Sequence, residues 1–220
     1  MQNVRDSFKN SRFAQKSAFM FVIIILITVI ISVVCFKDRS LFYKLSFNPY
    51  SVTKHNESYR VITHGFVHAD WMHLLLNMFV LYTFSDNVER AYVFLFGMKG
   101  YLFLLFLYVG ALLFSVIPSW AKHKDNVSYN SVGASGAVSA VVFASIILFP
   151  STKMMLLILP IPMPAWIFGI LYLIFEAYNA KRGQTNIGHD AHFAGAIYGA
   201  IFTLILDPKL GLSFLEQLTR

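Results

Sequence analysis

The chain has few charged residues and a single cysteine. Charged side chains make up 13% of its 220 residues, whereas hydrophobic residues make up 57%. A soluble globular domain carries roughly a quarter charged residues, about twice the share seen here. The lone Cys35 excludes an internal disulfide and does not fit a multi-cysteine metal site. The composition therefore indicates a membrane protein rather than a soluble enzyme or a disulfide-stabilised secreted domain.

Long apolar runs predict an all-α polytopic membrane protein with six transmembrane helices. Residues 17–36, SAFMFVIIILITVIISVVCF, carry no charge and have about the 20 residues that cross a bilayer. This run is too long for a cleavable signal peptide, and no small-residue cleavage site follows it. The other predicted spans are residues 72–95, 101–118, 133–149, 165–179 and 191–206. We expect the proline-rich stretch 154–164 to be a loop at the membrane interface, because proline interrupts helices.

The predicted spans form one domain with two short tails. We expect a basic cytoplasmic tail over residues 1–16, a six-helix membrane domain over 17–207 and a short C-terminal tail over 208–220. Lysine and arginine divide equally, nine to each side of the membrane, so the loop charges do not orient the chain. The basic first tail favours an N-terminus inside. The net charge of +7 fits lipid headgroups, and we expect the lipid bilayer as a partner and no nucleic acid.

Polar residues inside the second predicted span are the first functional candidates. An intramembrane polar side chain is costly and commonly marks a functional site. His73 and Asn77 are four residues apart, which places both side chains on one face of a helix. They can therefore donate hydrogen bonds toward one point. The alternative is that they join two helices by hydrogen bonds.

The sequence GASGA, residues 133–137, opens the fourth predicted span and contains the second candidate, Ser135. Glycine at 133 and 136 keeps the approach to the hydroxyl clear. The first turn of a helix has unpaired N–H groups and the positive end of the helix dipole, which favour an anion. The alternative is a packing face of small residues, with Gly133 beside Ala137 and Gly136 beside Ala140.

His192 begins the sixth predicted span and is the third candidate. Ala191, Gly195 and Gly199 recur every four residues there, which lets another helix come very close. The small-residue face of the fourth span is the natural partner, because the fourth and sixth of six spans run in the same direction. Packing of these two faces would bring His192 near Ser135.

These residues have the chemistry of a Ser–His dyad. A serine hydroxyl becomes a good nucleophile when a neighbouring base takes its proton, and a histidine can do so at neutral pH. His73, Asn77 and the backbone N–H of Ser135 can stabilise the oxyanion that forms on an attacked carbonyl. No carboxylate is placed to orient the base: Asp190 is two residues from His192 and off its helix face. Glu176, late in the fifth span, is expected at the membrane interface.

At this point the chain resembles the rhomboid intramembrane serine proteases over residues 17–207. The motifs are HGFVHADWMHLLLNM in the second span, GASG in the fourth and AHFAG in the sixth. The resemblance implies a rhomboid-like fold with both termini cytoplasmic and a membrane-embedded first loop, residues 37–62. It implies Ser135 as nucleophile, His192 as base, and His73 and Asn77 as oxyanion-side residues. Structural residues near the site are expected to be Gly133, Gly136, Gly195, Gly199, Arg60 and His68.

The resemblance also carries expectations about substrates, and one departure. It implies transmembrane-helix substrates that reach the site beside the fifth span, with no cofactor and no metal. We expect a multi-pass protein of the bacterial inner (plasma) membrane. Many members carry a tyrosine one turn after the nucleophile, stacked on the catalytic histidine, whereas this chain has Ser139. Something else must then hold His192, or its orientation is looser.

Three other functions compete with this interpretation. Histidines including His64, His68 and His189 could serve a metal-dependent membrane hydrolase, but no HExxH motif is present and Ser135 would be unexplained. A non-catalytic rhomboid-like protein that binds membrane clients typically lacks the serine or the histidine, and both are present here. A transporter would use buried His and Asn for passage, but no inverted repeat is visible.

Overall fold

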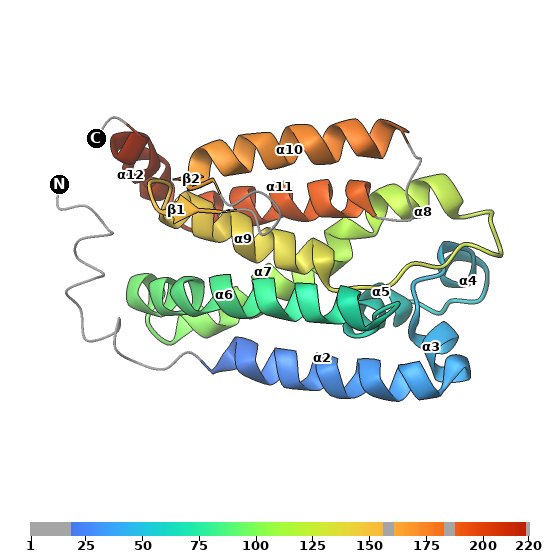
Figure 1. Cartoon of the computed structure of the whole chain (residues 1–220). Helices are drawn as coiled ribbons and strands as arrows, with labels where there is room; N and C mark the ends of the chain where they lie inside the picture. The colour runs from blue at the N-terminus through green and yellow to red at the C-terminus, as the bar shows by residue number, and fades with distance from the viewer. Residues whose placement is uncertain (1–18, 156–160, 183–187, 219–220) are drawn as a thin grey trace.

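The computed structural model describes residues 19–155, 161–182 and 188–218 and shows a bundle of long helices (Figure 1). The described elements are α2 (Met20–Lys37), α3 (Arg39–Leu45), α4 (Pro49–Lys54), α5 (Arg60–Thr63), the 3₁₀ helix η2 (His64–Phe66), α6 (Trp71–Phe96), α7 (Lys99–Ser115), α8 (Ile117–His123), α9 (Ser135–Leu148), β1 (Lys153–Met154), β2 (Met163–Pro164), α10 (Ala165–Arg182), α11 (His189–Leu206) and α12 (Lys209–Leu218). The predicted N-terminal tail, residues 1–16, lies outside the described residues.

The all-α prediction is confirmed, and helices α2, α6, α7, α9, α10 and α11 occupy the six predicted spans with ends that agree to within three residues. By length and apolar composition, two helical segments among the described residues can cross a membrane: α2 and the α7–α8 segment Lys99–His123. A third qualifies if α11 and α12, bent by 113°, count as one. Helix α9 has only 14 residues, short for a bilayer. The count of six spans therefore stays a prediction.

Helix α9 lies between α6 and α11 and carries the core of the bundle (Figure 1). Every residue from 136 to 144 is buried, so this helix is covered on all sides. A helix that is apolar all round belongs inside a protein, surrounded by other helices. Its first residue, Ser135, therefore lies directly before a continuous buried stretch of the chain.

The predicted packing of the fourth and sixth spans is confirmed. A Cβ added to Gly195 would lie 2.0 Å from the Gly136 carbonyl oxygen, and one added to Gly199 would lie 2.2 Å from that of Ala140. Because both contacts advance by four residues in the same direction, α9 and α11 run parallel. Only glycine permits backbones to approach this closely. The glycine strip therefore sets the spacing of the two helices that carry Ser135 and His192.

A buried carboxylate on α6 anchors the start of α2. Glu89 Oε1 accepts the backbone N–H groups of Phe19 and Met20 at 2.9 and 3.1 Å, and its Oε2 accepts that of Phe21 at 3.3 Å. These N–H groups belong to the helix end that has no intrahelical acceptors and carries the positive end of the dipole. Glu89 thus caps α2 from a neighbouring helix and fixes the position of α2 against α6.

The predicted first loop, residues 37–62, folds into the short helices α3 and α4 and the start of α5. Arg60 Nη1 donates to the carbonyl oxygens of Tyr43 and Ser46 at 2.6 and 2.8 Å, and its Nε pairs with Glu57. Asn48 Nδ2 donates to the carbonyl of Tyr129 at 2.9 Å, which ties the loop to the segment before α9. Arg60 therefore has a structural role in this loop. Its embedding in the membrane stays a prediction.

The remaining segments close the opposite end of the bundle. Strands β1 and β2 form a two-residue antiparallel pair at the ends of the proline-rich stretch 154–164. Residues 156–160 within that stretch lie outside the described residues. The predicted C-terminal tail is largely helical, because Lys209–Leu218 form α12, bent by 113° from α11. Its Gln217 carbonyl accepts a hydrogen bond from Ser151 Oγ at 2.7 Å.

Candidate active site

Ser135 is the first residue of α9, and a glycine turn presents it. Gly133 has a φ of +121°, a region that L side chains rarely adopt. A Cβ at this position would also lie 2.7 Å from Cε1 and 2.8 Å from Nε2 of His73. Glycine at 133 is therefore required both by the backbone conformation and by the His73 ring that lies against it.

His68 holds the residue before Ser135 through its backbone. The Ser32 hydroxyl donates to the Phe66 carbonyl at 2.9 Å, so it accepts the Nδ1–H of His68 at 3.0 Å. The Nε2 lone pair of His68 then accepts the backbone N–H of Ala134 at 3.4 Å. Burial lowers the pKa of His68 to about 3, so the ring is neutral at physiological pH and keeps one N–H and one acceptor. These contacts place His68 against the residue before Ser135, and its structural role there stays a prediction.

The carbonyl of His64 accepts the N–H of Gly133 at 3.0 Å, which adds a second attachment. The segment His64–His68 therefore hydrogen-bonds to the backbone N–H groups of Gly133 and Ala134, the two residues that precede Ser135. Because only residues 67–70 separate η2 from α6, these contacts also restrict where α6 begins relative to α9.

His73 and Asn77 lie on α6 as predicted, but their contacts differ. Asp70 caps the helix by accepting the backbone N–H of His73 at 2.8 Å, and the His73 ring faces the Gly133 turn. The buried Asn77 amide donates to the His73 carbonyl at 2.9 Å, within its own helix. His73 is thus next to the turn that presents Ser135, whereas the Asn77 amide hydrogen-bonds to the backbone of its own helix.

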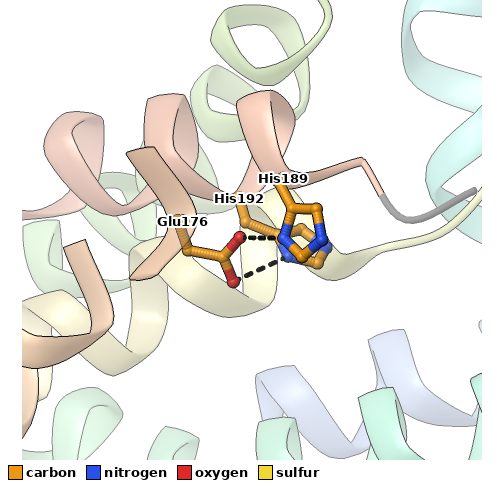
Figure 2. A group of neighbouring side chains, drawn as sticks. All are labelled: Glu176, His189 and His192. Atoms are coloured by element: carbon orange, nitrogen blue, oxygen red, sulfur yellow. Dashed lines mark hydrogen bonds and ion pairs between the residues drawn. The ribbon is translucent and has the colours of Figure 1, made fainter. Parts of the chain in front are cut away.

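His192 lies at the start of α11, and its Nδ1 faces a carboxylate that sequence analysis did not assign. Glu176 on α10 has its Oε1 at 3.2 Å from Nδ1 of His192 and its Oε2 at 2.6 Å from Nδ1 of His189 (Figure 2). Asp190, which sequence analysis set aside, pairs with Lys122 at 3.0 Å instead. The Glu176 side chain is buried, and its predicted place at the membrane interface stays a prediction.

The signal for Glu176 was present in the sequence. The residue interrupts the apolar run AWIFGILYLIFEAYN, and an ionisable residue within a membrane span is a functional candidate. What the sequence does not show is that the end of α10 meets the start of α11. Only that meeting gives the carboxylate its two imidazole partners.

Glu176, His189 and His192 also offer three potential metal ligands, with ligand atoms within 4.8 Å of one another. The 2.6 Å separation of His189 Nδ1 from Oε2 is that of a short hydrogen bond to a carboxylate. Two ligands that share one zinc ion at bond lengths of 2.0–2.1 Å lie about 3.3 Å apart. The arrangement therefore fits a hydrogen-bonded cluster better than a metal centre.

The starts of α9 and α11 are in contact. A Cβ added to Gly136, next to Ser135, would lie 3.3 Å from the carbonyl oxygen of Ala191, next to His192. Among the contacts of the described residues there is no hydrogen bond between the Ser135 hydroxyl and the His192 ring. Catalytic hydrogen bonds are often loose without substrate and tighten in the reacting complex.

Ser139, the departure from the family pattern, has a partner on α10. Its Oγ lies 2.8 Å from the hydroxyl of Tyr172, and the Ser139 side chain is buried. Tyr172 is one helical turn before Glu176 and interacts electrostatically with that carboxylate. A tyrosine thus does approach this position, but it comes from the neighbouring helix.

Comparison with known proteins identifies relatives for most of the chain. The family profile described as Rhomboid domain matches residues 55–209. RHOMBOID-like protein 12, mitochondrial, of Arabidopsis thaliana is 31% identical over 163 residues, which cover 67% of this chain and 46% of the relative. Rhomboid protein 1, mitochondrial, of Saccharomyces cerevisiae is 26% identical over 145 residues, 64% of this chain and 40% of the relative. The chain thus spans about half the length of the curated relatives it matches.

The predicted bacterial plasma membrane is wrong. Besides the two mitochondrial relatives, Rhomboid-like protein 11, chloroplastic, of Arabidopsis thaliana is 31% identical over 162 residues, covering 68% of this chain and 52% of the relative. All three relatives are named for mitochondria or chloroplasts, not for a bacterial plasma membrane. The error has a physical reason: apolar runs report the thickness of the hydrocarbon layer, which differs by only a few ångströms between membranes and does not identify the organelle.

Proposed function

Because the chain belongs to the rhomboid family, we propose that it is an intramembrane serine endopeptidase that cleaves transmembrane-helix substrates with Ser135 as nucleophile and His192 as base. The observation that carries the proposal is the contact between the first turns of the parallel helices α9 and α11. The Gly136–Gly195 approach supports it, because it brings the backbones beside Ser135 and His192 close together.

Acylation begins with proton transfer from the Ser135 hydroxyl to Nε2 of His192. Because Nδ1 faces Glu176, Nε2 is the nitrogen left for this role. Oγ forms a bond to the scissile carbonyl carbon, and the carbonyl electron pair moves to oxygen. When the tetrahedral intermediate collapses, the C–N bond breaks and the His192 imidazolium gives its proton to the leaving amine. The products of this half-reaction are an acyl-Ser135 ester and a released substrate fragment.

The oxyanion is stabilised by donors at the start of α9 and on α6. The backbone N–H of Ser135 is one of the orphan donors of the first helical turn. The His73 ring, which lies against the Gly133 turn, is the second proposed donor. Asn77, one turn further along α6, is the third, through the amide N–H that does not bond to the His73 carbonyl. Each such donor is worth about 10²–10³ in rate.

Deacylation follows the same steps, with water in place of the Ser135 hydroxyl as the nucleophile. His192 takes a proton from a water molecule that attacks the ester carbonyl, and the protonated ring then returns the proton to Oγ. The second substrate fragment leaves with a new carboxylate and Ser135 is regenerated. No cofactor is needed for this balance.

The proposal includes a location and a route for the substrate. The names of the relatives support an organellar membrane as the site of action. We place the entry of the substrate helix beside α10, because only three of the 18 residues of α10 are buried: Ala165, Gly169 and Glu176. A helix so lightly packed can move with little loss of buried surface.

Active-site labelling tests the proposal. Wild type, Ser135→Ala and His192→Ala are reconstituted in lipid vesicles, treated with a fluorophosphonate probe and assayed on a generic transmembrane-helix substrate, with and without chelator. Ser145→Ala, on the same helix as Ser135, is the matched control and should label like wild type. We expect labelling and cleavage that need both Ser135 and His192 and resist chelator.

Other outcomes would redirect the assignment. A folded wild type that neither labels nor cuts would favour a non-catalytic, client-binding rhomboid-like protein. Cleavage that stops on chelation would favour the metal-dependent hydrolase.

A further inference from the structure

Glu176 takes part in no bond-making or proton-transfer step of the dyad mechanism, yet it contacts the proposed base. Its two carboxylate oxygens each face one imidazole Nδ1, at 2.6 Å for His189 and 3.2 Å for His192 (Figure 2). The Glu176 side chain is 5% exposed, so these contacts are largely shielded from solvent. A buried carboxylate is costly unless its partners satisfy it, and both of its oxygens are satisfied here.

We propose that Glu176 is a positioning residue that orients His192 and selects the ring tautomer able to deprotonate Ser135. The proposal rests on the proposed function. An ionised carboxylate has no proton to donate, so the neutral His192 ring must present Nδ1–H to it. The lone pair then lies on Nε2, where a base for Ser135 needs it. The carboxylate also stabilises the imidazolium that forms during acyl transfer.

His189 completes the arrangement by holding the carboxylate from its other side. Its Nδ1 lies at Oε2, which leaves Oε1 directed at His192. His189 and His192 lie on the same helix, one turn apart, so both grip the carboxylate from α11. The His189 ring therefore fixes the orientation of the carboxylate, and the carboxylate in turn orients the His192 ring.

Tyr172 ties the same stretch of α10 to α9. Its hydroxyl lies 2.8 Å from Ser139 Oγ, one turn before Glu176 along α10. Position 139 holds serine, so no tyrosine there can stack on His192. The Glu176 carboxylate on α10 orients His192 instead. Because α10 buries only three residues, the position of the base depends on where this lightly packed helix sits.

Kinetics of Glu176 variants test the role. Glu176→Gln keeps the shape of the side chain but removes the charge and can donate to Nδ1, which favours the wrong tautomer. We expect the rate constant of fluorophosphonate labelling and kcat to fall about 10²- to 10⁴-fold with KM unchanged. Glu176→Asp, which keeps the carboxylate, should recover part of the loss. Asn179→Leu is the matched control, because Asn179 is on the same helix and its amide donates to the Phe175 carbonyl one turn earlier.

A wild-type measurement keeps the test decisive if Glu176→Gln does not fold. Histidine labelled with ¹⁵N reports the tautomer of His192 by solid-state NMR, with His192→Gln identifying the signal. The proposal requires a proton on Nδ1 that is hydrogen-bonded to a carboxylate. An Nε2–H tautomer would overturn it, as would wild-type labelling and kcat in folded Glu176→Gln, or labelling that requires added zinc.

The two proposals fail separately. If the wild type does not label Ser135, the protease assignment fails whatever the tautomer. If the wild type labels and Glu176→Gln labels at the same rate, the protease assignment stands and the positioning role is lost.

Discussion

Replacing Gly195 by alanine tests whether the closeness of α9 and α11 creates the site. The added Cβ would lie 2.0 Å from the carbonyl oxygen, 2.7 Å from the carbonyl carbon and 2.9 Å from Cα of Gly136. All three atoms are backbone, so no side chain can rotate away. The ordinary Cβ contact begins at 3.4 Å, and the helices must therefore separate locally by about 1.4 Å.

The size of the effect follows from this displacement. Overpacking a closely packed interior costs about 1–3 kcal/mol. At about 2–4 °C per kcal/mol for a chain of this length, the unfolding midpoint should fall by about 2–12 °C. Ser135 adjoins Gly136, so the separation also moves the nucleophile away from His192. A misplacement of about 1 Å costs about 10²-fold in rate.

Thermal unfolding in detergent micelles and the rate of fluorophosphonate labelling measure the two effects. The matched control is Gly169→Ala in α10, where the nearest atom to the new Cβ is the Ile146 Cδ1 at 3.2 Å, the end of a flexible side chain. Both changes gain the same intrinsic helix propensity, so that contribution cancels. Equal midpoints and equal labelling in the two variants would refute the claim that the Gly136–Gly195 approach brings the site together.

Three further predictions follow from other contacts. Glu89→Gln weakens the cap on α2 and should lower the free energy of unfolding by about 1–3 kcal/mol, measured by thermal unfolding. The control Asp86→Asn breaks the half-exposed pair with Arg90 and should cost less than about 1 kcal/mol. Equal losses in the two variants would contradict the capping role of Glu89. Ser139→Tyr should lower turnover, because Ser139 is buried against Tyr172 and a second ring would displace α10; a gain in turnover would show instead that His192 is under-held. Asn77→Ala should lower kcat about 10²-fold with KM and the unfolding midpoint unchanged; wild-type kcat would remove Asn77 from the oxyanion proposal.

Much of this protein can be predicted from local pattern. Apolar runs predict the positions of the long helices because their length and continuity reflect burial in lipid or in the bundle. The small-residue strips at Gly136 and Gly195 predict which helices touch, since only small residues allow close backbones. The roles of Ser135 and His192 stay proposals that rest on this contact and on the family.

The sequence alone could not locate the partner of His192. Helical spacing compares residues within one helix, and by that rule Asp190 was set aside correctly and Glu176 was left without a role. The carboxylate reaches the ring from α10, 16 positions earlier in the chain. The same holds for Glu89, whose helix-capping contacts lie 68 to 70 positions away.

By itself, the sequence determined that the chain is apolar and helical, where its long helices lie, and that α9 and α11 can pack through glycine. These follow from composition and from periodicity along one helix. The tertiary structure alone decided the partners of these polar groups. Glu176 contacts two histidines, His68 bonds to the Ala134 N–H, and Tyr172 bonds to Ser139. The physical reason is that a buried polar side chain needs a hydrogen-bond partner, and spacing along the chain predicts that partner only when it lies in the same helix.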